Sequence, residues 1–116
     1  MKTLVVIKTR FDAVHNWPDC DINGVDFLEH PHRHMFYVVM KFIVTHSNRD
    51  IEFLTKKKEV DKFIDLNYKG KYVGPRSCED LAGELLRQFD ASFVSVFEDD
   101  ENGAECYNEQ PNRSLL

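Results

Sequence analysis

The feature that most constrains the fold is a run of alternating residues that begins with a His-x-His pair. The run occupies every second position: His32, His34, Phe36, Val38, Met40, Phe42 and Val44. Because successive side chains of a β-strand point to opposite faces, this period of two predicts a strand over about 32–45. The two histidines then share one face of the strand with the apolar residues, and Lys41 and Thr45 lie on the other face.

The rest of the chain predicts the order strand, strand, helix, helix, strand, strand. A first strand is expected over about 4–14 and a first helix over about 53–65. A second helix follows the capping-box pattern at 77–80. The last two strands, about 92–98 and 104–107, flank Asn102-Gly103, a pair typical of tight hairpin turns. We therefore expect one domain over 1–107 and a polar tail over 108–116.

Composition narrows the classes of partner. The 116 residues carry a net charge of −5 and no long basic run, which argues against a general binder of nucleic-acid phosphates. The longest apolar stretch, 35–44, is interrupted by Lys41 and is far too short to cross a bilayer. Three cysteines without Cys-x-x-Cys spacing indicate no disulfide framework and favour a reducing compartment. We therefore expect a cytoplasmic protein without nucleic-acid or membrane partners.

A third histidine, His15, follows the first predicted strand and can join His32 and His34 in one site. Three protein ligands with one coordination position left open are typical of a catalytic zinc. His30 shares the alternation of the pair, but Pro31 places it before the strand, and His46 is expected to be solvated. The pattern therefore predicts that His15, His32 and His34 bind Zn²⁺.

These residues belong to an ordered set of motifs over about 4–107. The motifs are Phe11-Asp12-Ala13-Val14-His15, His32-Arg33-His34-Met35-Phe36, Ser77-Cys78-Glu79 and Val96-Phe97-Glu98. The set resembles the family of 6-pyruvoyl-tetrahydropterin and 6-carboxytetrahydropterin synthases. The resemblance implies an α+β tunnelling fold, in which a four-stranded antiparallel sheet (ββααββ) carries two helices on one face. It also implies self-association into trimers or hexamers that close the sheets into a barrel.

The resemblance implies a function as well. Family members are zinc-dependent lyases that act on 7,8-dihydroneopterin triphosphate and give a 6-substituted tetrahydropterin, on a pteridine or deazaguanine pathway. Glu98 stands where the family has the glutamate that anchors the pterin ring, and a carboxylate can accept the paired N–H donors of such a ring. Glu79 matches a second glutamate near the pterin, although its charge would also suit the first turn of a helix.

The expected acid–base residues depart from the family pattern. The family has a cysteine four to six residues before the His-x-His pair, where this chain has Asp, Phe and Leu at 26–28. Cys20, as a thiolate, or Glu29, as a carboxylate of raised pKa, could replace it. After the first helix the family reads Leu-Asp-His, whereas 64–67 keeps Asp65 and lacks the histidine.

Three hypotheses follow from this combination. The first is a zinc-dependent lyase that uses Cys20, Glu29 and Asp65 for proton transfer. The second is a catalytically altered member of the family that binds a pterin- or purine-like ligand at a zinc site, and the missing relay histidine favours it. The third is a structural oligomer with incidental histidines, which leaves the coincidence of three ligands and Glu98 without a cause.

Overall fold

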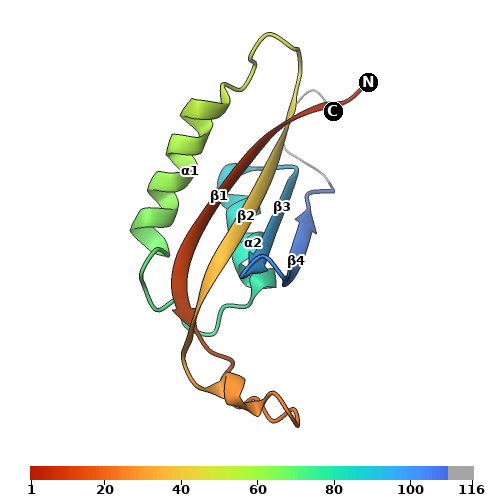
Figure 1. The fold of residues 1–116 in the computed structure, drawn as a ribbon. Coiled ribbons are helices and arrows are strands. Elements are labelled where there is room, and N and C mark those ends of the chain that lie inside the picture. Colours follow the sequence, from red (N-terminus) through yellow and green to blue (C-terminus); the bar gives the residue numbers. More distant parts are fainter. Residues whose placement is uncertain (110–116) are drawn as a thin grey trace.

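Two thirteen-residue strands, β1 (Thr3–His15) and β2 (His32–Val44), form the longest part of the sheet in the computed structural model, which describes residues 1–109 (Figure 1). They pair antiparallel over their full length, from Thr3 opposite Val44 to His15 opposite His32. The segment 16–31 that joins them projects beyond the end of the sheet and contains a short 3-10 helix, η1 (Asp26–Glu29). The pairing therefore fixes two histidines side by side where the sheet ends.

The other elements follow in the predicted order. They are α1 (Phe53–Asn67), α2 (Cys78–Phe89), β3 (Phe93–Glu98) and β4 (Asn102–Tyr107). All four strands are antiparallel neighbours in the order β1-β2-β3-β4. The α+β class, the four-stranded sheet and the two helices are thus confirmed. The barrel of several subunits stays a prediction, and positions 110–116 of the predicted tail lie outside the described residues.

Both helices cover the same face of the sheet. Helix α1 packs on β1, and α2 packs on β3 and β4. The buried strand residues on this face alternate as predicted: Ile7, Phe11, Ala13, Phe36, Val38, Met40, Phe42, Val94 and Val96. They form one core with the inner faces of the helices, which include Val60, Ile64, Leu81 and Leu85. Because His34 and Glu98 follow this alternation, both side chains belong to the helix-covered face.

The N-terminus of α2 is fixed by the predicted capping box. Ser77 accepts a hydrogen bond from the Asp80 amide at 3.1 Å, and the Asp80 carboxylate accepts one from the Ser77 amide at 3.1 Å. Such caps stabilise a helix by about 0.5–2 kcal/mol. The start of α2 is therefore a defined point from which Cys78 and Glu79 can face a site. Within residues 1–109, no helix is both long and apolar enough to cross a membrane.

The predicted hairpin turn at Asn102-Gly103 is wrong. The turn lies earlier, where Asp99 and Asp100 both have positive φ, 52° and 59°, and the Glu101 amide donates to the Glu98 carbonyl at 2.9 Å. Two successive left-handed residues match the right-handed twist of a hairpin, and aspartate tolerates this conformation. Both residues of the pair lie in β4, where Gly103 faces Phe97.

Gly103 serves a close approach of two strands. A Cβ at this position would clash with the Val96 carbonyl oxygen and lie 2.6 Å from the Phe97 Cα. Since both obstacles are backbone, rotation of a side chain cannot relieve the clash. The glycine is therefore required by the packing of β4 on β3, not by a turn.

We expect Gly103→Ala to lower the free energy of unfolding by about 1–3 kcal/mol, since overpacking must displace backbone. Urea unfolding followed by circular dichroism measures this change. The matched control is Gly83→Ala in α2, where an added Cβ meets only the flexible Arg87 side chain at 3.2 Å. That variant should keep or raise stability, because alanine favours a helix over glycine by about 0.5–1 kcal/mol. Equal effects of the two substitutions would contradict the assignment.

Candidate metal centre

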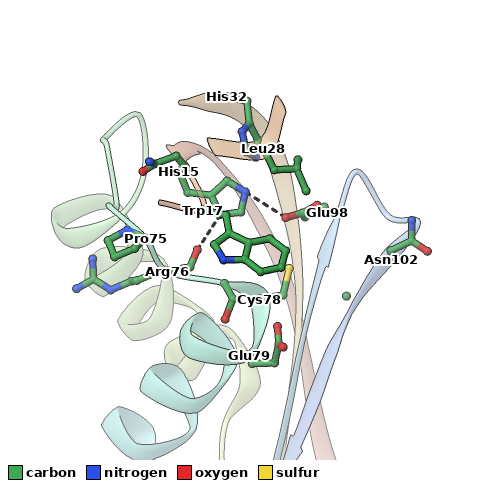
Figure 2. Close-up of a pocket in the computed structure, with 13 residues that line it drawn as sticks. His15, Trp17, Leu28, His32, Pro75, Arg76, Cys78, Glu79, Glu98 and Asn102 are labelled. Atoms are coloured by element: carbon green, nitrogen blue, oxygen red, sulfur yellow. Dashed lines mark hydrogen bonds and ion pairs between the residues drawn. The ribbon is translucent and has the colours of Figure 1, made fainter. Parts of the chain in front are cut away.

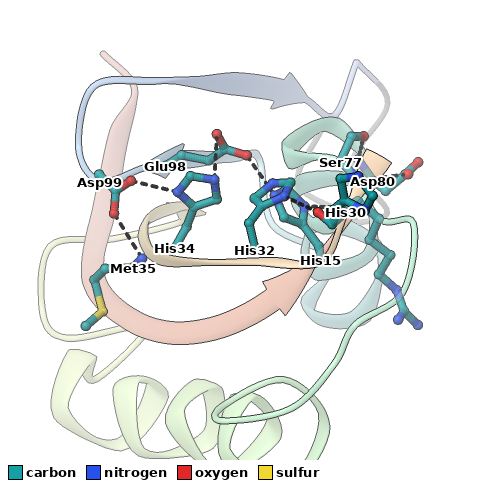
Figure 3. A network of polar contacts seen from close by, with 10 residues as sticks. His15, His30, His32, His34, Met35, Ser77, Asp80, Glu98 and Asp99 are labelled. Atoms are coloured by element: carbon teal, nitrogen blue, oxygen red, sulfur yellow. Dashed lines mark hydrogen bonds and ion pairs between the residues drawn. The ribbon is translucent and has the colours of Figure 1, made fainter. Parts of the chain in front are cut away.

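Three imidazoles converge at the end of the β1–β2 pair (Figure 3). The ring centroid of His15 lies 4.6 Å from that of His32 and 5.4 Å from that of His34, and the last two are 4.9 Å apart. One ligand nitrogen from each ring lies within 4.8 Å of the other two. The predicted ligands are thus brought together, and the three histidines could hold a metal ion.

Each of the three rings is oriented through its Nδ1 atom. The partners are the Arg76 carbonyl for His15 at 2.7 Å, the His30 carbonyl for His32 at 2.8 Å and the Asp99 carboxylate for His34 at 2.7 Å. A carbonyl or carboxylate oxygen can only accept, so Nδ1 must donate in each pair. A neutral imidazole that donates from Nδ1 carries its free lone pair on Nε2. This is the outer-shell arrangement that usually surrounds metal-binding histidines.

The Nε2 atoms of His15 and His34 support the same conclusion. Both atoms are buried, and neither makes a hydrogen bond among residues 1–109; each has a Glu98 oxygen nearby, which a neutral ring cannot pair with through this nitrogen. A buried polar atom left unsatisfied costs about 1–3 kcal/mol. An ion at the centre of the cluster would satisfy both nitrogens, so this donor set fits a bound metal.

Glu98 lies against the same cluster. Its Oε2 is 3.1 Å from Nε2 of His15 and its Oε1 is 3.5 Å from Nε2 of His34. Contact with His15 lowers the pKa of Glu98 against the opposing effect of burial, and the nearby His34 and His32 lower it further. Burial lowers the pKa of His15, but the Glu98 carboxylate and the Arg76 carbonyl outweigh it and the pKa is raised. The centre of the cluster therefore attracts positive charge.

A pocket of about 420 Å³ opens beside His15 and His32 (Figure 2). It lies where the 16–31 segment, the start of α2 and the β3–β4 hairpin meet. Its other walls are Asn16, Trp17, Leu28, Pro75, Arg76, Ser77, Cys78, Glu79, Glu98, Asn102 and Gly103. Both predicted binding carboxylates, Glu79 and Glu98, thus border one pocket next to the histidines. A small planar ligand in it could contact an indole ring, two carboxylates and the metal centre.

The predicted acid–base residues lie elsewhere in the chain. Cys20 is buried inside the 16–31 segment, where its thiol donates to the Val25 carbonyl at 3.5 Å. Glu29 is exposed on η1, and Asp65 is exposed on α1. Cys20, Glu29 and Asp65 are therefore not among the described residues that line the pocket. One chain therefore brings together the metal and ligand candidates but not the expected proton-transfer groups.

Sequence reasoning missed Cys78, which does line the pocket. The side chain is buried, and it lines the same pocket as Trp17 and Glu98 (Figure 2). Burial and the adjacent Glu98 and Glu79 carboxylates raise the pKa of Cys78 to about 12. The thiol is therefore protonated at neutral pH and can donate a proton or a hydrogen bond. The sequence feature that could have identified Cys78 is its position directly after Ser77, the N-cap residue of α2.

A second layer of contacts holds the carbonyl that orients His15. The Arg76 guanidinium donates to Glu84 at 2.7 Å and to the Val73 carbonyl at 2.9 Å. The Tyr68 hydroxyl donates to the other Glu84 oxygen at 2.9 Å. Since Glu84 belongs to α2 and Tyr68 follows α1, both helices contribute to the orientation of a residue at the end of β1.

Comparison with solved structures shows that another protein shares this fold. No family model and no curated protein matches the sequence. The fold matches the crystal structure of an uncharacterized protein from Wolinella succinogenes with a TM-score of 0.83, over 94% of this chain and 99% of that chain. The two sequences are 12% identical, so the likeness extends to the fold alone.

We expect Asp99→Asn to weaken metal binding roughly tenfold or more, since loss of an outer-shell partner of a ligating histidine typically costs 10–100-fold. Competition with a chromophoric chelator measures the affinity. Asparagine tolerates the left-handed backbone of Asp99, so the turn is kept. Asp100→Asn makes the same change at the adjacent left-handed residue, which contacts no histidine ring among residues 1–109, and this variant should bind metal normally. Equal affinities of the two variants would refute the role of Asp99.

We also expect the Cys78 thiol to react more slowly with iodoacetamide than that of the partly exposed Cys106. Only the thiolate reacts, and Cys78 is a thiolate only near its raised pKa of about 12. Between about pH 7 and pH 9 its rate should therefore rise by roughly tenfold per pH unit without levelling off. Peptide mass spectrometry after timed labelling gives both rates, and unfolded protein serves as the reference. A plateau for Cys78 below pH 9 would contradict the assignment.

Proposed function

We propose that the protein is a zinc-dependent lyase that acts on 7,8-dihydroneopterin triphosphate or a related reduced pterin and gives a 6-substituted tetrahydropterin. The observation that carries the proposal is the cluster of three imidazoles, each held through Nδ1, of which His15 and His32 line a pocket. Three neutral nitrogen ligands are those of catalytic zinc sites. The resemblance in motif order supports the choice of a pterin as substrate.

The ligands in this proposal are His15, His32 and His34. Zinc bound there would act as a Lewis acid on a substrate oxygen at the open position. Glu98 and Glu79 border the pocket and could accept the paired N–H donors of a pterin ring. The Cys78 thiol stands between them as a proton donor, and Trp17 offers a flat apolar wall. The residues of the chain thus bind and orient a ring next to the metal.

Proton transfer is the part of the proposal that needs a second chain. Asp65 is exposed on α1 and away from the pocket of its own chain, so it could act only in a neighbouring subunit's pocket. The proposal therefore includes self-association into a trimer or hexamer, with Glu29 and Cys20 as the other candidate bases. It also places the enzyme in the cytoplasm, in keeping with three free cysteines in the described part of the chain.

A second candidate function is a zinc-containing protein that binds a pterin- or purine-like ligand without converting it. The observation in its favour is that Cys20, Glu29 and Asp65 all lie outside the pocket. General acid–base catalysis contributes roughly 10²–10⁴-fold, so a chain without such groups would turn over very slowly. The same metal centre and the same carboxylates would still hold the ligand.

The test is metal content followed by turnover. Protein purified without a histidine tag should contain about one zinc per chain by plasma mass spectrometry, and His34→Ala should lose most of it. Zinc-loaded protein should then convert 7,8-dihydroneopterin triphosphate, with chromatography of the pterins as the readout. Tight pterin binding without product would select the second function. Protein that stays metal-free after zinc is offered would refute both.

A further inference from the structure

The Glu98 carboxylate is directed at the metal ligands as well as at the pocket. Glu98 ends β3 opposite Phe36 and lies on the helix-covered face together with His34. Figure 3 shows its oxygens above the three rings, with dashed contacts to His34 and His15. We propose that Glu98 is the fourth ligand of the metal ion and closes its open position until a ligand displaces the carboxylate. This inference rests on the three-histidine metal site of the proposed function.

The distances fit a shared coordination sphere. Zinc binds histidine nitrogen and carboxylate oxygen at about 2.0–2.2 Å, so neighbouring ligand atoms of a tetrahedral site lie about 3.3–3.5 Å apart. Glu98 Oε2 is 3.1 Å from His15 Nε2, and Oε1 is 3.5 Å from His34 Nε2. The spacing to His34 falls in this range and the spacing to His15 is slightly shorter, so both nitrogens lie close enough to Glu98 to share one ion with it. A carboxylate devoted to a ring in the pocket has no need to approach two ligand nitrogens this closely.

The electrostatics point to the same assignment. The Nδ1 donors of His15 and His34 are already used, so each neutral ring turns a lone pair toward the carboxylate. Neither Nε2 is hydrogen-bonded among residues 1–109, despite the short distances to Glu98. Lone pairs and a carboxylate repel each other in a partly buried site unless a cation, either a proton or a metal ion, lies between them. A metal ion shared by the three groups supplies that cation.

The consequence is a site that opens by exchange. With Glu98 bound to the ion, four protein ligands leave no position for a substrate oxygen, as in a closed structural zinc site. A ligand with paired N–H donors can draw the carboxylate away and place its own oxygen on the ion in the same event. The neighbouring Glu79 lines the pocket but contacts none of the three histidines among residues 1–109, so the proposal gives this role to Glu98. The site should thus be specific for ligands that both donate hydrogen bonds to the Glu98 carboxylate and place an oxygen on the ion.

Cobalt-substituted protein tests this assignment without any turnover. Wild type, Glu98→Gln and Glu101→Gln are loaded with Co²⁺, and their visible spectra and metal affinities are compared. Glutamine keeps the size of the side chain and removes the anionic ligand. We expect Glu98→Gln to alter the visible cobalt bands and to weaken metal affinity roughly 10–100-fold, as for changes in the surroundings of other metal sites. Glu101→Gln removes the same charge three residues away in the exposed turn and should match wild type.

Azide gives a second readout, because it occupies an open position on cobalt. In wild type it must displace Glu98, so we expect Glu98→Gln to bind azide at a clearly lower concentration than wild type or Glu101→Gln. Identical cobalt spectra and identical azide titrations for all three proteins would overturn the assignment and leave the three-histidine site intact. A wild type that takes up no cobalt would instead overturn the metal site and the proposed function with it.

Discussion

The register between β1 and β2 determines the site as well as the fold. Because side chains alternate between faces, a slip of one residue would turn the histidines and the apolar residues to the opposite face at once. Burial of Phe11 and Phe36, which are paired across the two strands and stacked at 5.3 Å, therefore selects the register that also pairs His15 with His32. The hydrophobic core and the candidate metal centre depend on the same thirteen-residue ladder. A mutation that weakened this core would disturb the ligands without touching them.

The sheet brings the three rings together, but residues outside β1 and β2 aim them. The Arg76 carbonyl comes from the segment before α2, and the Asp99 carboxylate comes from the β3–β4 turn. Asp99 also accepts from the Met35 amide at 3.1 Å and donates its own amide to the Met35 carbonyl at 2.7 Å, which extends the β2–β3 ladder into the turn. Ring orientation therefore requires the helices and the hairpin in place, so the site is complete only in the fully folded chain.

Sequence patterns predicted the parts of this arrangement that have a period or a side-chain signature. The strands, the capped helix and the three histidines stand where local rules placed them, whereas Glu98 was singled out only by the family resemblance. The patterns failed where the cause is a contact between distant segments. Gly103 is a glycine because of the backbone of β3, and Asp99 lies in an acidic run that suggests only solvation. His15 is oriented by the backbone carbonyl of Arg76, and the position of a backbone carbonyl cannot be predicted from the type of residue that carries it. Cys20 is a candidate, beside Glu29, for its chemistry alone, and its place in the 16–31 segment follows from loop contacts that have no sequence period.

The position of Glu98 reconciles two demands on one carboxylate. A group that only anchored a ring would leave the two buried Nε2 atoms of His15 and His34 facing an unneutralised anion, and a group that only ligated the ion would leave the pocket without an acceptor at its inner end. One Glu98 oxygen lies near each of the two ring nitrogens, and the side chain is 31% exposed where it borders the pocket. The candidate metal centre and the pocket therefore share one carboxylate, that of Glu98. If Glu98 ligates the ion as proposed, part of the binding free energy of a ring would be used to displace the carboxylate from the ion. Recognition of the ring would thereby be coupled to activation of its oxygen.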